Sequence, residues 1–166
     1  MSNYPLKTIL STFSNTKGNK RTVFNAGPIG GINSNFIKLF LLSLPFVEYA
    51  LIFNPTVFNA LGIAAAIVFF IVFLSIVMII VFLVVWSTKK SVIKKITPSW
   101  EQYFQGKDIN MVLSSGITPY SDFFKYYSKI VNDDLSEEEL QKSLLESFKL
   151  MEAENKDLID AMSRER

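Results

Sequence analysis

The chain contains neither cysteine nor histidine among its 166 residues. Their absence excludes disulfide bonds, thiol nucleophiles, zinc sites of the usual Cys/His type, haem ligation through histidine, and acid–base catalysis by imidazole. We therefore expect no metal site, no cofactor and no enzymatic activity. A chain without cysteine suits an oxidising and a reducing compartment equally, so the redox environment stays open.

Acidic residues are nearly absent from the first part of the chain. Residues 1–96 carry nine Lys/Arg and one acid, Glu48, for a net charge of +8, whereas residues 97–166 carry eight Lys/Arg and fourteen Asp/Glu, for −6. Basic charge beside an apolar segment suits contact with the anionic headgroups of a lipid bilayer. Nucleic acid is not an expected partner, because the segment with soluble character is acidic.

The longest apolar run is Ala60–Trp86, 27 residues without a charge, a proline or an amide. A run of 18 or more apolar residues is the signature of a transmembrane helix. As a helix it would be about 40 Å long, more than the ~30 Å hydrocarbon core of a bilayer requires. The sequence therefore predicts an all-α integral membrane protein.

A second apolar stretch, Phe36–Phe53, is less regular, because it contains Lys38, Pro45 and Glu48. It is interpreted either as a short first transmembrane helix, kinked at Pro45 with Lys38 reaching the headgroups, or as a helix that lies in the interface or re-enters. The positive-inside rule favours the first interpretation. Lys/Arg residues lie before this stretch and after the long one, and the connector Asn54–Asn59 has none.

Both basic flanks are expected on the cytoplasmic side, which requires an even number of crossings. The sequence thus predicts a two-helix transmembrane hairpin with both termini cytoplasmic, in a bacterial inner membrane or equivalent, an organelle membrane being the other possibility. The lysines expected to contact headgroups flank the two helices: Lys38, Lys89, Lys90, Lys94 and Lys95.

Small residues at the outer end of the long helix predict close packing against the first helix, near Ser43 and Ala50. They form two pairs with small-xxx-small spacing: Ala60 with Ala64, and Gly62 with Ala66. Glu48 is the acid within the membrane segment, and ionisable residues at that depth are costly and often functional. Three roles remain open for it: ion or proton handling, a structural or partner contact, and simple reach to the headgroups.

The remaining segments complete the predicted domain organisation. Residues 1–35 are a polar, basic arm whose low apolar content implies that it needs partners to become ordered. The hairpin occupies 36–87, with helices at about 36–53 and 60–86. A basic juxtamembrane linker follows at 88–98, where Pro98 is expected to end any continuing helix, and 99–166 form an acidic helical cytoplasmic domain.

Within that domain, Thr118-Pro119 predicts the start of a helix to Val131, and Ser136 with Glu139 predicts a capping box at the start of the last helix. The aromatic stripe and the apolar heptads of these helices are candidate docking positions for partners: Phe123, Phe124, Tyr127, Leu144, Phe148, Met151, Asn155 and Leu158. Packing of the two helices on each other is the preferred interpretation, and a coiled coil with Asn155 at an a position is the alternative.

The leading hypothesis is a non-catalytic membrane subunit that anchors and scaffolds a larger assembly through other membrane and cytoplasmic subunits. The layout is loosely like that of small membrane components of secretion or conjugation machines, and a respiratory-type complex or a lipid-containing virion also fits. An oligomeric pore or holin-like protein using Glu48 is the alternative, and a homo-oligomer is possible. A protease using a Ser-x-x-Lys pair at Ser87 or Ser91 is a third hypothesis, which the exposed basic cluster disfavours.

Overall fold

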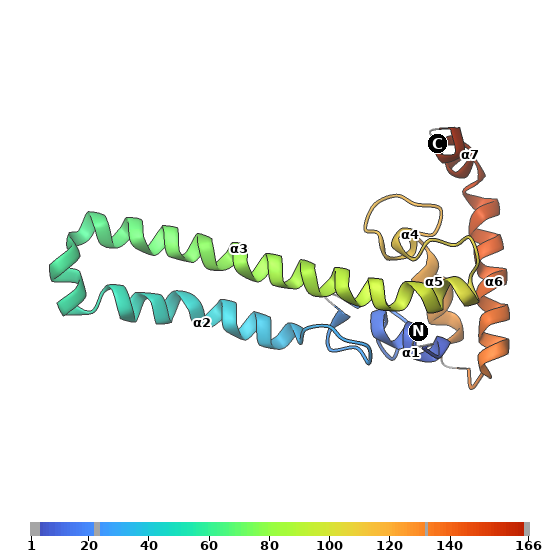
Figure 1. Cartoon of the computed structure of the whole chain (residues 1–166), viewed down its shortest axis with the longest axis horizontal. Coiled ribbons are helices and arrows are strands. Elements are labelled where there is room, and N and C mark those ends of the chain that lie inside the picture. Colours follow the sequence, from blue (N-terminus) through green and yellow to red (C-terminus); the bar gives the residue numbers. More distant parts are fainter. Residues whose placement is uncertain (1–3, 22–23, 132, 165–166) are drawn as a thin grey trace.

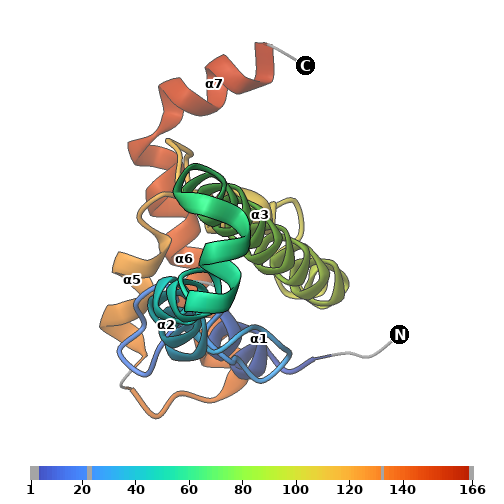
Figure 2. The ribbon, with the colours of Figure 1, turned by 90° about the vertical axis from the view of Figure 1, so that its left-hand side faces the viewer.

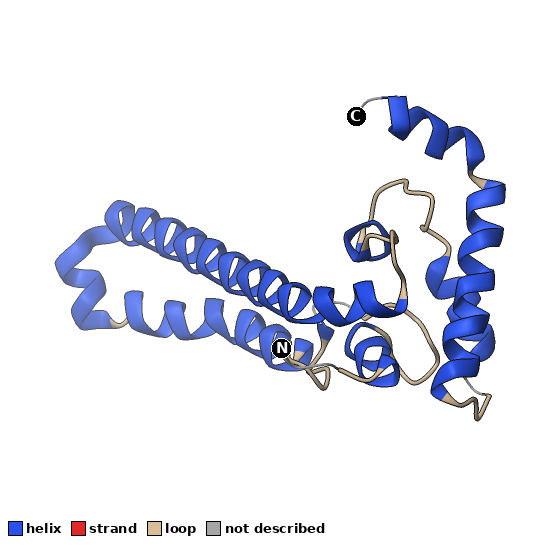
Figure 3. Cartoon of the chain, turned by 45° about the vertical axis from the view of Figure 1, so that its right-hand side comes forward, coloured by secondary structure: helices blue, strands red, loops and turns tan. Residues whose placement is uncertain are grey.

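The structure, a computed structural model, describes residues 4–21, 24–131 and 133–164. Helices account for 74% of the chain, and the described residues contain no strand, only two isolated bridges. Figure 3 shows this purely helical architecture. The helices are α1 (Leu6–Phe13), α2 (Ser34–Ile52), α3 (Pro55–Tyr103), α4 (Ile109–Leu113), α5 (Phe123–Ile130), α6 (Glu137–Glu154) and α7 (Lys156–Arg164).

Helices α2 and α3 lie side by side and run in opposite directions, away from the remaining helices (Figure 1). Asparagine caps both starts: Asn33 accepts a hydrogen bond from the Asn35 amide, and Asn54 accepts one from Thr56 at 3.0 Å. Pro55 occupies the first turn of α3, where its missing N–H costs nothing. The long helix therefore begins directly after Asn54, five residues earlier than the sequence predicts.

Both helices are long and apolar enough to cross a membrane. Most of their large apolar side chains face outward; Phe46 of α2 is 72% exposed and Phe82 of α3 is 68% exposed. An apolar surface of this extent is not stable in water and marks contact with lipid or with another protein. The membrane character predicted from composition thus agrees with the outward-facing surface of the folded chain.

Helices α1, α4, α5 and α6 pack in one core around Trp100, which lies near the C-terminal end of α3. Its ring is fully buried, and the rings of Phe13, Phe104, Phe123 and Phe148 have centroids within 6.2 Å of it. The Trp100 indole N–H donates to the Lys107 carbonyl at 2.7 Å, so its polar atom is satisfied. Figure 2 views the molecule from the end of the α2–α3 pair and shows α5 and α6 to one side of α3.

Helix α1 is part of this core, which differs from the polar arm expected for residues 1–35. Leu6, Ile9, Leu10 and Phe13 are all fully buried. Their spacing of three and four residues places them on one face of the helix. The order of this segment is explained by its own domain, without any partner.

Helix α3 continues from the apolar stretch into the same core. Residues 88–98, expected as a basic juxtamembrane linker, are part of α3, and Val92, Ile96 and Trp100 are buried on one face of it. The helix also passes through Pro98, which was expected to end it. The hydrogen bond that Pro98 cannot donate would go to the Lys94 carbonyl; both residues are exposed, so water can replace it.

Candidate functional site

The candidate site lies between α2 and α3, where Glu48 is buried. The buried residues of α2 are Leu44, Glu48 and Ile52, four residues apart and hence on one face. Across from α2, the buried residue in the apolar part of α3 is Ala66, which is fully inaccessible. Glu48 is 2% exposed, and within the described part of the chain neither of its carboxylate oxygens has a hydrogen-bond partner.

The chemistry of this site is set by what surrounds the carboxyl group. The nearest ionisable side chains along α2 are Lys38, almost three turns away, and Tyr49, which points outward; α3 has none before Lys89. Burying a carboxylate without a donor is strongly unfavourable. The arrangement therefore leaves both carboxyl oxygens without a donor from the described part of the chain.

Pro45 lies inside α2, and a break in the regular helix conformation lies in α3. Helix α2 runs from Ser34 to Ile52 through Pro45, whereas α3 is interrupted at Gly62, with φ 73° and ψ 163°. This conformation is essentially restricted to glycine. A Cβ atom at Gly62 would meet nothing within 4 Å, so the glycine is explained by its backbone angles and not by close packing.

Of the four small residues expected to pack the helices, only Ala66 is buried; Ala60, Gly62 and Ala64 are exposed. The break at Gly62 explains the exposure of Ala60, because the first turns of α3 lead away from the straight part that lies along α2 (Figure 1). Ala64 follows the break but lies two residues from Ala66, on nearly the opposite face of the helix. On α2, Ser43 and Ala50 face outward, and the Leu44–Glu48–Ile52 face makes the contact in their place.

The predicted headgroup lysines lie at the ends of the apolar segments that are nearest to the folded domain. Lys38, Lys90, Lys94 and Lys95 are exposed, and Lys89 is half-buried. Lys90 Nζ lies 5.5 Å from the centre of the Trp86 ring, a cation–π contact. These positions agree with contact to a membrane surface.

The predicted docking residues mostly lie inside the domain. Phe123, Tyr127, Leu144, Phe148 and Met151 are buried in its core, so packing of α5 on α6 accounts for them. Phe124 remains half-buried, with its ring edge-on to Phe13 at 6.3 Å, and Leu158 of α7 is also half-buried.

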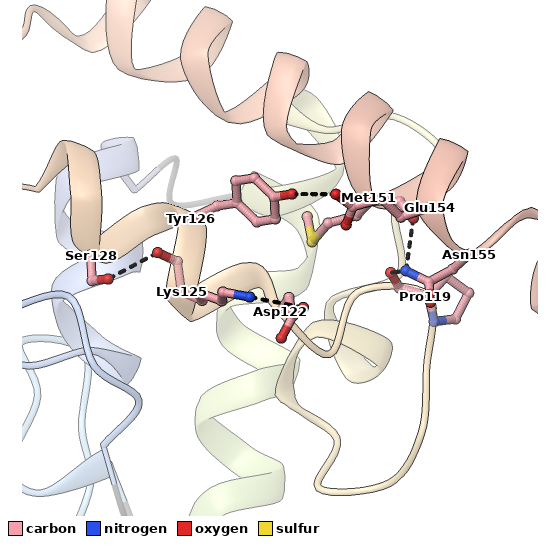
Figure 4. Close-up of polar contacts among 8 residues, drawn as sticks. All are labelled: Pro119, Asp122, Lys125, Tyr126, Ser128, Met151, Glu154 and Asn155. Carbon is pink, nitrogen blue, oxygen red and sulfur yellow. Dashed lines mark hydrogen bonds and ion pairs between the residues drawn. The ribbon is translucent and has the colours of Figure 1, made fainter.

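Asn155 ends α6 and interrupts the heptad pattern. Its side-chain amide donates to the Met151 carbonyl at 2.8 Å and to the Pro119 carbonyl at 3.2 Å (Figure 4). The chain then restarts as α7 in a different direction (Figure 1). A continuous coiled coil through Asn155 has no support in this geometry.

A polar cluster on α6 was not foreseen. The carboxylate of Glu152 forms an ion pair with Lys107 and accepts a hydrogen bond from the Tyr120 hydroxyl at 2.7 Å. Burial disfavours the charged form of Glu152, but the hydrogen bonds from Lys107 and Tyr120 outweigh this effect and lower the pKa of Glu152. Burial and the nearby Glu152 carboxylate raise the pKa of the Tyr120 hydroxyl. The sequence gives no sign of this cluster, because Lys107, Tyr120 and Glu152 are far apart in the chain and only the fold brings them together.

A cavity of about 460 Å³ adjoins this cluster, between α4, α6 and α7. Its lining combines apolar side chains, among them Met111 and Ile159, with the carboxylates of Asp108 and Glu152. Among the residues that the structure describes, no group of three or more Asp/Glu side chains is placed to hold a metal ion. The chain matches no protein-family model, no curated protein and no solved structure.

Proposed function

We propose that this chain is a non-catalytic membrane subunit. In this proposal α2 and α3 form a transmembrane hairpin, and the helical domain built on its two ends scaffolds neighbouring subunits on the cytoplasmic side. The observation that carries the proposal is the continuity of α3, which runs from an outward-facing apolar segment into the core around Trp100 without a flexible linker. A helix shared in this way transmits position rigidly between membrane and domain.

The core also supports the expected topology. Helix α1 precedes the hairpin and α4–α6 follow it, yet all of them pack in one core. Two segments of one folded core lie on the same side of a membrane, so the intervening chain must cross it an even number of times. This argument is independent of the positive-inside rule and supports the same even number of crossings, whereas the cytoplasmic side is inferred from that rule.

The outward-facing apolar surface supports contact with further membrane helices as well as lipid. Within the apolar segments only Leu44, Glu48, Ile52 and Ala66 are buried by the chain itself. The other large apolar side chains of the two helices are mostly exposed, so they are available for such contacts. Other membrane and cytoplasmic subunits, or copies of this chain, are the partners of this proposal.

The pore hypothesis receives less support from the positions of the polar groups. Glu48 faces α3 within the same chain, and the Ser43 and Ser75 hydroxyls donate to carbonyls of their own helices, Phe40 at 2.9 Å and Ile71 at 2.7 Å. An outward polar stripe for a pore is therefore not formed by these groups. Ion flux through reconstituted protein, lost on Glu48→Gln, would favour the pore over the scaffold.

Topology is tested with single cysteines, since the chain has none of its own. We expect Thr16→Cys and Ser115→Cys to react with a membrane-impermeant maleimide from one side, and Thr56→Cys from the other. All three positions are exposed. Labelling of Thr16→Cys and Ser115→Cys from opposite sides would contradict the hairpin.

The scaffold role is tested by releasing the tagged chain from its native membrane in mild detergent and measuring particle size and composition by native gel and mass spectrometry. The proposal expects a particle with defined additional subunits in fixed ratios. A monomer or a pure homo-oligomer that conducts ions would replace the scaffold by the pore.

A further inference from the structure

A small pocket lies where the apolar part of α3 meets the folded domain. It has a volume of about 230 Å³ and is lined by Trp86, Lys89, Lys90 and Ile93 of α3 and by Asn110 of α4. The four α3 residues are spaced by three, one and three positions, so they share one face over two turns. We call this cavity the Trp86 pocket.

The position of the Trp86 pocket along α3 defines its surroundings. Trp86 is the last residue of the 27-residue uncharged stretch and is 54% exposed. Tryptophan is enriched where hydrocarbon meets headgroups, and lysines just beyond it extend toward the phosphate level. Toward the hydrocarbon the same face continues with Phe82 and Ile79, both exposed. One face of α3 thus offers an apolar track that leads into a cationic pocket.

The charges at the Trp86 pocket lack a counter-charge. In the described part of the chain, the ion pairs join Lys107 to Glu152 and Lys125 to Asp122, so neither Lys89 nor Lys90 is paired with a carboxylate. Lys20, from the loop after α1, adds positive charge: burial first, and then repulsion from Lys89, lower its pKa. An anion beside Lys89 would relieve this repulsion.

Asn110 closes the pocket from the side of the domain. Its amide donates one hydrogen bond to Asp108 Oδ1 at 2.9 Å, and an amide nitrogen carries a second hydrogen that a ligand can accept. The Asp108 carboxylate, engaged by this bond and by the Asn110 backbone amide at 2.8 Å, does not line the pocket. The domain therefore supplies a neutral donor opposite the two lysines.

We propose that the Trp86 pocket binds the phosphate headgroup of one anionic phospholipid, whose acyl chains lie along Phe82 and Ile79. Lys89 and Lys90 contact the phosphate, Trp86 packs on the glycerol region and the Asn110 amide donates to a phosphate oxygen. The inference rests on the proposed function, because the pocket meets lipid only if the hairpin is in the bilayer. A membrane lipid is favoured over soluble phosphate because the apolar track continues the pocket toward the hydrocarbon.

The test compares two double variants of the full-length chain with the same change in charge. Lys89→Gln/Lys90→Gln removes the lysines of the pocket; Lys94→Gln/Lys95→Gln removes the exposed pair about one turn farther along α3, outside it. Each protein is purified in detergent, and retention of phosphatidylglycerol against phosphatidylcholine is measured by native mass spectrometry. We expect the wild type to retain one phosphatidylglycerol molecule, and the pocket variant to bind it roughly 30-fold more weakly, since each direct ion pair of a partly exposed lysine with the phosphate contributes about 1 kcal/mol.

The control variant is expected to stay within about twofold of the wild type, because its lysines only add to the diffuse surface potential. Asn110→Leu, which fills the pocket without changing the charge, is expected to lose the preference for phosphatidylglycerol. An equal loss in both double variants would overturn the pocket in favour of diffuse attraction. Displacement of the lipid by excess glycerol phosphate would overturn it in favour of a soluble phosphate ligand.

A separate measurement distinguishes failure of the proposed membrane function from failure of the lipid pocket alone. Extraction of the wild-type chain from membranes by alkaline carbonate would show that the hairpin is not in the bilayer, and would overturn both proposals. Resistance to carbonate together with equal retention of the two lipids would overturn the lipid pocket alone.

Discussion

The carboxylate of Glu137, at the start of α6, accepts a hydrogen bond from the backbone amide of Leu6, 131 positions earlier in the chain. The same Oε1 atom accepts the hydroxyl of Tyr103 at 2.8 Å. Leu6 is the first residue of α1 and Tyr103 the last of α3, so one side chain joins three helices. A carboxylate at a helix N-terminus also interacts favourably with the helix dipole, here that of both α1 and α6.

We expect Glu137→Gln to loosen α1 from the domain. Loss of a charge-assisted bond to a helix N-terminus costs about 1 kcal/mol, and short helices such as α1 depend on tertiary contacts. Limited proteolysis in the loop at residues 14–21 should become faster. Glu138→Gln is the matched control: it removes the neighbouring, exposed acid of the same first turn and should leave proteolysis unchanged. Equal acceleration in both variants would assign the effect to the dipole of α6 alone.

The segments predictable from the sequence are those whose signal is local. The apolar run to Trp86 and the pairing of Ser136 with Glu139 lie within a few residues, and the capping box is confirmed by both of its hydrogen bonds. Both candidate spans are likewise helical. Local composition and capping are sufficient for elements of this kind.

The remaining features depend on contacts that the sequence order does not show. The apolar face of α1 is only two turns long, and its burial depends on Trp100, almost ninety positions after Phe13. Thr118 was expected to cap α5, but its hydroxyl donates to the Met111 carbonyl at 2.9 Å, and the helix begins only at Phe123. Glu48 was recognised as an acid in an apolar segment, but its burial depends on the packing of α2 against α3.

The close approach of α2 and α3 at Ala66 can be tested by size. Ala66 is fully buried, so we expect Ala66→Leu to separate the two helices and to destabilise their contact by about 1–3 kcal/mol, as overpacking does. Ala64→Leu is the control, because Ala64 is exposed on the same helix. The measurement is thermal unfolding in nanodiscs. A larger loss in Ala64→Leu than in Ala66→Leu would contradict the interface.

The ion pair between Lys107 and Glu152 predicts a dependence of stability on pH. The pKa of Glu152 is lower in the folded chain than its ordinary value, so its stabilising contribution is present above about pH 4.5 and is lost as the pH falls through the folded value. We expect the loss of folding stability in acid to be smaller in Lys107→Met than in the wild type. The difference should be about 1 kcal/mol or less, because the Lys107 and Glu152 side chains are both partly exposed.

The measurement is the unfolding midpoint in denaturant at pH 7, 5 and 3.5, followed by near-UV circular dichroism. Lys149→Met, at an exposed position on α6, is the control and should keep the wild-type pH profile. An unchanged profile in Lys107→Met would show that Glu152 does not carry the dependence.

Substitution of Glu48 distinguishes two explanations for the burial of its carboxyl group. If it serves only the packing of α2 on α3, Glu48→Leu should leave stability unchanged or raise it by about 1–2 kcal/mol, because a buried polar group without a partner is replaced by an apolar one of similar size. If another subunit supplies a donor, Glu48→Leu should weaken the assembly while the isolated chain stays stable.

Both quantities can be measured on the same variant: thermal unfolding of the purified chain, and the size of the particle released from native membranes. Glu48→Gln helps to distinguish the cases, because an amide can still accept a donor from a partner but carries no charge. We expect Glu48→Leu to stabilise the isolated chain, and Glu48→Gln to preserve the assembly. Destabilisation of the isolated chain by Glu48→Leu would show that the carboxyl group has a partner within the chain, contrary to the geometry at Ala66.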